Sequence, residues 1–138
     1  MTPNFRFSAP IEVRFRDLDA LGHVNNAVYF TYMEMARVAY FKHLGLIGES
    51  YPEPFFIIAE ATCQFKAPID LNTKLRVEAR VSRLGHSSFD MDYLLIDGAT
   101  DRVMATGRTV QVVFDYAAGR SVPLPEAWRQ TLRDFEGL

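Results

Sequence analysis

The sequence predicts an α+β fold in which a curved antiparallel sheet wraps around one long central helix. Three observations support this prediction: a single long helical pattern, four strand patterns after it, and short loops between those strands. Successive strands joined by short loops form antiparallel sheets. A long helix with a wide apolar face has to be buried, and the sheet is the only large surface available to cover it.

The N-terminal third contains a strand pattern followed by a helix pattern. Residues 10–17 alternate with the period of a half-buried strand. The apolar positions of this expected strand are Ile11, Val13 and Phe15. From Asn25 the apolar residues recur every three or four positions, which predicts a helix of roughly 18 residues. Asn25 or Asn26 is a suitable N-cap, and Gly45 is a suitable C-terminal cap.

The rest of the chain is dominated by strand patterns. The expected strands are 55–68, 75–84, 88–97 and 103–116. Residues 125–135 begin with a proline and predict a short terminal helix. No repeat, low-complexity segment or domain boundary interrupts these patterns, so residues 1–138 are expected to form one domain.

The composition argues against several classes of function. The net charge is −2 with the signs interleaved and no basic run, which makes nucleic acid an unexpected partner. Cys63 is the single cysteine, so no intrachain disulfide is possible and a reducing, cytoplasmic compartment is expected. No signal-peptide pattern and no run of roughly 18 apolar residues occurs, so no membrane association is expected.

The junction between the first strand and the helix contains the strongest candidate site. Asp17, Asp19 and His23 come directly before the helix start at Asn26. First-turn N–H groups lack intrahelical partners and carry partial positive charge, so they can polarise a carbonyl or hold an oxyanion. Asp19 could then act as nucleophile or as general base for water. Turn and cap roles, which are common for Asp and Asn, are the alternative explanation.

A second candidate site lies in the turn of VSRLGHSSFD. Arg83 could pair with a phosphate, and Gly85 allows close approach of the backbone to a ligand. An ordinary hairpin turn is the alternative. Ser87 and Ser88 lack a G-x-S-x-G elbow, which argues against a serine hydrolase. No GxGxxG, GxxxxGK, HExxH or CxxC pattern occurs, so no nucleotide or metal site is expected.

Other polar and aromatic residues have simpler explanations. Glu34 lies on the apolar helix, and Arg37 three residues later is its expected partner. Cys63 is expected to be a small core residue. Some aromatic and methionine side chains could line a binding tunnel, but core packing is the better explanation for most of them. These side chains are Tyr29, Tyr32, Met33, Phe55 and Phe56.

The stretch VRFRDLDALGHVNNAVYFTYMEMAR, residues 13–37, resembles the N-terminal signature of the 4-hydroxybenzoyl-CoA thioesterase-like branch of the hotdog-fold superfamily. It is also similar to the corresponding block of bacterial long-chain acyl-CoA thioesterases and plant acyl-ACP thioesterases. The resemblance implies a hotdog fold, with the long helix enclosed by the sheet. It also implies dimers, often paired into tetramers, with active sites at the dimer interface.

The resemblance also implies roles for individual residues. The family's catalytic aspartate falls on Asp19, and the helix-start amide that polarises the thioester carbonyl falls on Asn26. His23 matches a histidine of the acyl-ACP and long-chain branches. In the acyl-ACP branch an asparagine follows the aspartate by two residues, whereas this chain has Leu21 there. The family's CoA-contacting turn falls on Arg83, Gly85, Ser87 and Ser88, and Tyr29 is a further substrate-binding candidate.

These observations predict an acyl-CoA thioesterase of fatty acid metabolism, a hydrolase that acts on a small-molecule acyl-CoA as a homodimer or homotetramer. No metal or bound cofactor is expected. Two alternatives remain open: a hydratase-like enzyme that uses Asp19 and His23, and a non-catalytic acyl-CoA-binding protein. Three further points remain open: the class of the acyl group, whether its carrier is CoA or acyl carrier protein, and whether Asp19 acts as nucleophile or as general base.

Overall fold

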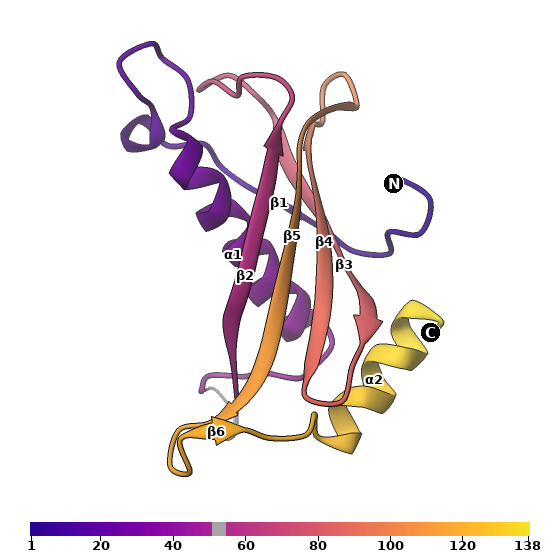
Figure 1. Ribbon diagram of the computed structural model, residues 1–138. Coiled ribbons are helices and arrows are strands. Elements are labelled where there is room, and N and C mark those ends of the chain that lie inside the picture. Colours follow the sequence, from indigo (N-terminus) through magenta and orange to yellow (C-terminus); the bar gives the residue numbers. More distant parts are fainter. Residues whose placement is uncertain (51–54) are drawn as a thin grey trace.

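The computed structural model describes residues 1–50 and 55–138. In chain order its elements are β1 (Ser8–Pro10), a 3-10 helix (Phe15–Asp17), α1 (Asn26–His43), β2 (Phe55–Phe65), β3 (Leu75–Leu84), β4 (Ser88–Asp97), β5 (Arg102–Asp115), β6 (Arg120–Ser121) and α2 (Glu126–Glu136). The strands form one six-stranded antiparallel sheet, and the architecture is α+β, as the sequence predicts (Figure 1). Within the described residues, no helix is long and apolar enough to cross a membrane.

The sheet has the strand order β1-β3-β4-β5-β2, with β6 paired to β5. Although β3 follows β2 in the sequence, β2 pairs with β5, in a register that runs from Phe55 opposite Phe114 to Phe65 opposite Ala105. The chain therefore crosses from one side of the sheet to the other between β2 and β3. This crossing leaves β2 as an edge strand of the described sheet.

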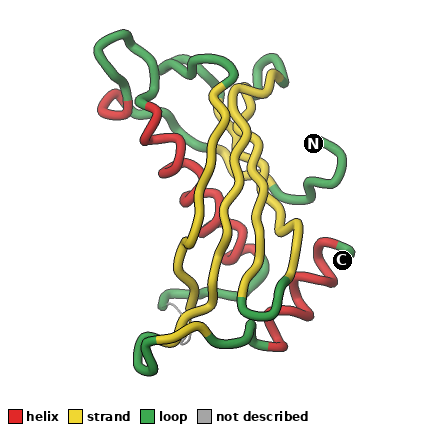
Figure 2. The backbone as a smooth tube through the Cα atoms, in the orientation of Figure 1, coloured by secondary structure: helices red, strands yellow, loops and turns green. Residues whose placement is uncertain are grey.

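The helix α1 crosses one face of the sheet, as Figure 2 shows. Its buried face includes Met33 and Ala36, which are fully inaccessible to solvent. The close approach of helix and sheet depends on Gly107 of β5, because a Cβ atom there would fall 2.5 Å from Met33 Sδ. The helix has 18 residues, and its start is capped by the Asn25 side chain, which accepts the Ala27 N–H at 2.9 Å.

The first and last residues predicted from the sequence are correct for some helices and strands and wrong for others. The strands β3 and β4 have the predicted bounds. The predicted strand over 10–17 is wrong, because β1 ends at Pro10 and the chain turns into a 3-10 helix at Phe15–Asp17. Ile11 and Val13 are buried as the alternation predicts, but Phe15 is 81% exposed. The short strand β6 was not predicted.

The terminal helix α2 packs against the C-terminal end of α1. Trp128 contacts the ring of Phe41, with 5.4 Å between centroids. Glu136 accepts hydrogen bonds from the Tyr40 hydroxyl at 2.6 Å and from the Val81 N–H at 2.9 Å. Burial raises the pKa of Glu136 above its usual value, and these two hydrogen bonds act against the rise. The helix therefore closes the end of the helix–sheet core that lies away from the start of α1.

Candidate active site

The loop that carries Asp19 is fixed by backbone hydrogen bonds. Leu18 and Val24 form an antiparallel bridge, and the Asp19 N–H donates to the His23 carbonyl at 2.7 Å. The Val24 N–H donates to the Ile69 carbonyl at 2.8 Å. The loop is thus closed on itself and tied to the segment that follows β2, so the position of Asp19 does not depend on side-chain packing alone.

The two carboxylate oxygens of Asp19 have different surroundings. Oδ1 accepts the Leu21 N–H at 2.9 Å and the His23 N–H at 3.2 Å. For Oδ2, the described part of the chain provides no donor. One oxygen therefore orients the group, and the other remains available to accept a proton from water or to attack a carbonyl carbon.

The start of α1 provides an unused donor close to this carboxylate. The Ala27 N–H is bonded to the Asn25 side chain, and the Val28 N–H donates to the Asn25 carbonyl at 2.9 Å. The Asn26 N–H has no acceptor among residues 1–50 and 55–138. Because it lies at the positive end of the helix, it can stabilise a partial negative charge on a bound group.

A cavity of about 270 Å³ brings these groups together. Its lining consists of Asp19, His23, Val24, Asn26, Tyr29, Phe65, Lys66, Ala67 and Pro68. Four of these, Asp19, His23, Asn26 and Tyr29, are residues that the sequence singles out. The segment 65–68 at the end of β2 was not predicted to join them, because its contribution depends on how the strand is placed in the sheet.

Asp17 has a different environment from Asp19, although only one residue separates them. Its side chain is almost fully buried, and Oδ2 accepts the Tyr32 hydroxyl at 2.7 Å. The Arg14 guanidinium and the Arg14 backbone N–H each donate to it at 3.0 Å. Burial pushes the pKa of Asp17 up, but the hydrogen bonds from Tyr32 and Arg14 and the Arg14 charge lower it more strongly. The Asp17 carbonyl also accepts the Asn25 N–H at 2.9 Å, so Asp17 holds the helix start in place.

The predicted CoA-contacting turn lies away from this cavity within one chain. It joins β3 to β4 at the end of the sheet opposite the Asp19 loop (Figure 1). The Arg83 Nε donates to Asp90 at 3.2 Å, and a Cβ atom at Gly85 would fall 2.9 Å from Ser88 Oγ. The structure therefore does not bring Arg83, Gly85, Ser87 and Ser88 to Asp19 in a single protomer.

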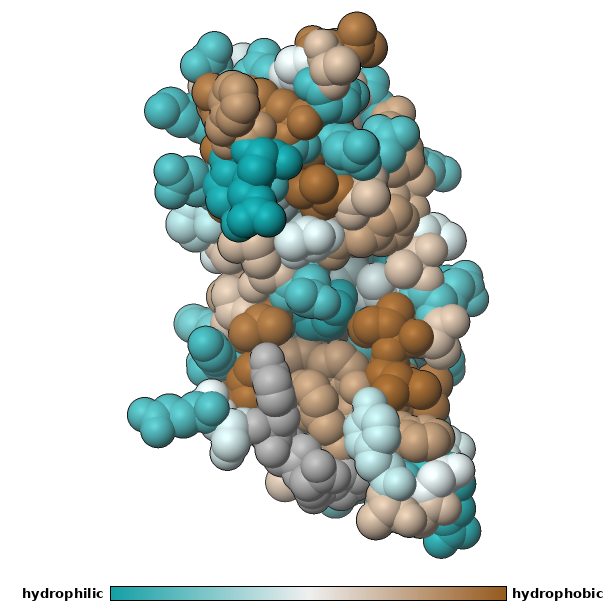
Figure 3. Space-filling view, turned by 90° about the vertical axis from the view of Figure 1, so that its left-hand side faces the viewer, coloured by the Kyte–Doolittle hydropathy of each residue, from teal (hydrophilic) through white to brown (hydrophobic). Residues whose placement is uncertain are grey.

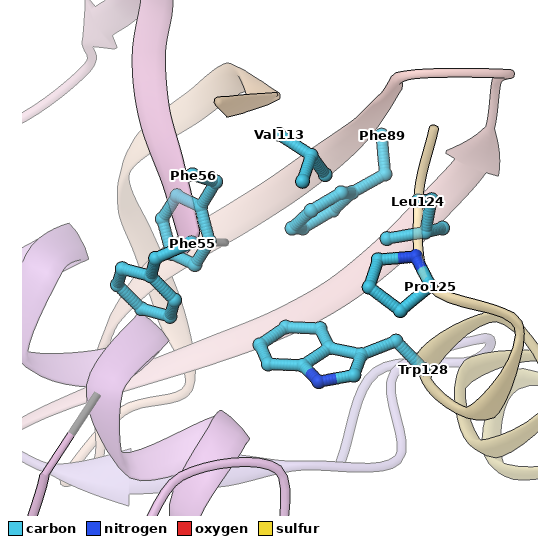
Figure 4. Close-up of a pocket in the computed structure, with 7 residues that line it drawn as sticks. All are labelled: Phe55, Phe56, Phe89, Val113, Leu124, Pro125 and Trp128. Atoms are coloured by element: carbon cyan, nitrogen blue, oxygen red, sulfur yellow. The ribbon is translucent and has the colours of Figure 1, made fainter. Parts of the chain in front are cut away.

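The other expected tunnel residues are divided between the core and the far end of α1. Tyr32 and Met33 are core residues. Phe55 and Phe56 lie with Trp128 around an apolar pocket, which Figure 4 shows together with its remaining lining residues. None of its lining residues among those that the structure describes is titratable, so they offer packing rather than chemistry.

The expected helix pair forms only a loose contact. Arg37 and Glu34 are 3.9 Å apart, and Arg37 is buried whereas Glu34 is exposed. The Arg37 guanidinium instead donates to the Tyr93 hydroxyl at 3.1 Å. Cys63 is half-buried, and burial raises the pKa of its thiol to about 11. No group of three or more His, Cys, Asp or Glu side chains that could hold a metal occurs in the described ranges.

A long helix laid on an antiparallel sheet is the architecture of hotdog-fold thioesterases, and in this chain the helix N-terminus and the Asp19 carboxylate share one cavity. The chain belongs to the thioesterase-like superfamily, whose family model matches residues 13–132. The sequence resemblance to hotdog-fold thioesterases is thereby confirmed.

Individual relatives agree with this assignment. A thioesterase from Thermus thermophilus, whose crystal structure is a complex with coenzyme A and Zn, is 38% identical, and the match covers 99% of this chain and 98% of that one, with a TM-score of 0.86. A thioesterase-superfamily protein from Jannaschia sp. CCS1 is 25% identical over 99% of this chain and 87% of that one, with a TM-score of 0.88. The chloroplastic acyl-acyl carrier protein thioesterase ATL3 of Arabidopsis thaliana is 25% identical over 91% of this chain and 66% of that protein.

The contacts of Asp17 predict an acid-sensitive contribution to stability. Tyr32→Phe removes a hydrogen bond to a buried charge, so we expect the free energy of unfolding at pH 7 to fall by about 1.5–3 kcal/mol. Because the folded-state pKa of Asp17 is lowered, its contribution is present above the ordinary pKa and is lost as the pH falls through the folded-state pKa. The difference between wild type and variant should therefore narrow in acid.

Urea unfolding followed from pH 7 down to about pH 2 measures this effect. The matched control is Tyr116→Phe, because Tyr116 is 60% exposed and lies far along the chain in the β5–β6 turn. It should unfold like wild type at every pH. A Tyr32→Phe difference that stays constant across the whole range would contradict the role given to Asp17.

Proposed function

We propose that this protein is an acyl-CoA thioesterase that hydrolyses an acyl-CoA to a free acid and CoA. The observation that carries the proposal is the single cavity in which Asp19 Oδ2 and the Asn26 N–H both lack a partner among the described residues. The thioester oxygen accepts the Asn26 N–H, which withdraws charge from the carbonyl carbon. A preorganised donor at this position stabilises the charge that develops in the transition state.

Asp19 can act by one of two mechanisms, as general base or as nucleophile. As general base it takes a proton from water, and the hydroxide oxygen bonds to the carbonyl carbon. The C–S bond then breaks, and the proton on Asp19 passes to the leaving sulfur. As nucleophile, Oδ2 bonds to the carbonyl carbon, the thiolate leaves, and water hydrolyses the resulting anhydride. His23 lines the same cavity and is a candidate proton donor to the leaving thiolate.

The comparisons support CoA as the carrier of the acyl group. The Thermus thermophilus relative was crystallised with coenzyme A and is the more similar of the two named enzymes. The Arabidopsis thaliana relative is an acyl-acyl carrier protein thioesterase and is less similar. Water and the side chains of the cavity supply every proton and electron pair of the proposed reaction, so we expect turnover without an added cofactor or metal.

A second copy of the chain completes the proposed site. The edge strand β2 has an unpaired side in the described sheet, and Ile57 and Ile58 on it are 37% and 40% exposed. Figure 3 views this side of the molecule and shows hydrophobic side chains gathered above and below its middle. Two β2 edges that pair across a two-fold axis run antiparallel. The end with the Arg83 turn in one copy then lies on the same side as the Asp19 end of the other.

Replacement of Asp19 tests the proposed chemistry. Asp19→Asn keeps an oxygen for the Leu21 and His23 N–H groups but removes the charge, so we expect turnover to fall at least ~100-fold. The assay is thiol release from short, long and aryl acyl-CoAs, with an acyl-ACP as a further substrate. Free thiol appears on hydrolysis and not on hydration of the acyl group.

Asp115→Asn is the matched control. Asp115 Oδ1 accepts the Ala117 and Ala118 N–H groups at 2.9 and 3.1 Å, in a turn at the far end of β5. It should keep wild-type turnover. If thiol release survives in Asp19→Asn, the role of Asp19 is wrong. If wild type releases no thiol from any of these substrates, the chain is not a thioesterase for these acyl groups, and the binding-protein alternative gains support.

The proposed dimer predicts a concentration-dependent mass. We expect wild type to sediment as a dimer or tetramer, and the double variant Ile57→Lys/Ile58→Lys to shift toward monomer with loss of turnover, because charges on an edge strand oppose pairing. Leu71→Lys is the control, since Leu71 is 47% exposed and lies outside β2. A fully active wild-type monomer in sedimentation velocity would rule out this arrangement.

A further inference from the structure

Tyr29 differs from the other buried tyrosines in how its hydroxyl is bonded. Four tyrosines of the described residues are buried. In three of them the hydroxyl bonds to a side chain: Tyr32 to Asp17 at 2.7 Å, Tyr40 to Glu136 at 2.6 Å and Tyr93 to Thr109 at 2.8 Å. Tyr29 is 2% exposed, yet no acceptor for its proton is found within the described part of the chain.

The position of Tyr29 is set by the same elements that form the cavity. It lies three residues after Asn26, and residues at this spacing share one side of a helix. Its ring contacts Phe65 of β2 edge to face, with 4.8 Å between centroids and 82° between planes. The ring is therefore fixed by packing, and the residue lines the cavity with Asp19 and Asn26.

The hydroxyl of Tyr29 is a donor rather than a base. Burial raises its pKa above the usual value, the Ile69 hydrogen bond acts against this rise, and the acidic groups of Cys63 and Asp19 add to it. The phenol therefore keeps its proton at neutral pH. A phenol has one O–H donor as well as acceptor lone pairs. Since no acceptor for this O–H is found among the described residues, it remains to serve a group inside the cavity.

We propose that the Tyr29 hydroxyl is a second hydrogen-bond donor to the thioester oxygen, beside the Asn26 N–H. The inference rests on the proposed thioesterase function. When the carbonyl carbon becomes tetrahedral, its oxygen gains negative charge, and the two donors share that charge. When the C–S bond breaks, the carbonyl reforms and the charge leaves the oxygen. The Tyr29 proton stays on the phenol throughout, so no proton has to be replaced.

This arrangement favours the transition state over the bound substrate. The ring is held against Phe65, so little reorganisation of the side chain is needed when charge develops. The cavity lining also includes Lys66, a cationic donor besides the side chains of His23 and Asn26. Lys66, however, is exposed to solvent. Tyr29, which is buried and packed against Phe65, is therefore better placed than Lys66 to act as a fixed donor.

Tyr29→Phe tests the proposal, because it deletes the hydroxyl and keeps the ring that contacts Phe65. We expect kcat for the best acyl-CoA of the panel to fall about 100-fold, with KM changed by less than about threefold, as for other transition-state donors. The urea midpoint should stay close to that of wild type. Tyr116→Phe, which removes an exposed hydroxyl outside the cavity, should change neither kcat nor the urea midpoint.

The other outcomes separate this proposal from the proposed function. A raised KM with unchanged kcat would mean that Tyr29 only binds the substrate, and would overturn its role in the transition state. A kcat that falls only together with the urea midpoint would indicate a structural role and overturn it too. Full activity of Tyr29→Phe beside an inactive Asp19→Asn would refute this inference alone. If the wild-type protein releases no thiol, both the proposed thioesterase function and the proposed role of Tyr29 are refuted.

Discussion

The buried carboxylate of Asp17 fixes the place where α1 begins, and the candidate site depends on that place. The carboxylate joins the helix, through Tyr32, to the chain before it, through Arg14, while its backbone carbonyl holds Asn25. A buried charge persists only where partners satisfy it, so each of these bonds constrains the others. With both ends of the Asp19 loop held in this way, the helix N-terminus and the Asp19 carboxylate share one cavity.

The second constraint is the order of the strands. Because β2 pairs with β5 rather than with β3, its other side is an edge, and the segment after it returns past the start of α1. That return places Phe65 and Lys66 at the cavity and lets the Ile69 carbonyl accept the Val24 N–H. The same crossing therefore completes one wall of the site and exposes the strand that we propose as the contact between two copies.

Local sequence patterns predict the elements better than they predict their neighbours. The limits of β3 and β4 and the length of α1 follow from periodicity and caps, which are local properties. The strand prediction over 10–17 failed at Phe15, because the bonds between Arg14 and Asp17 turn the chain there. A side-chain hydrogen bond of this kind leaves no trace in the pattern of apolar residues. The pairing of β2 with β5 and the contribution of Lys66 to the cavity likewise depend on contacts between residues that are far apart in the sequence. Asp19, His23, Asn26 and Tyr29 were found because they are close together in the sequence.

Environment, rather than residue type, divides the roles of the two aspartates. Asp17 is buried and bonded at both oxygens, so its charge stabilises the fold and is not available to a substrate. Asp19 is exposed to the cavity and bonded at one oxygen only. Two carboxylates separated by one residue can thus serve structure and chemistry because burial and donors differ between them. The tyrosines divide in the same way: the Tyr32 hydroxyl donates to Asp17, whereas Tyr29, one turn earlier on α1, lines the cavity and has no acceptor for its proton among the described residues.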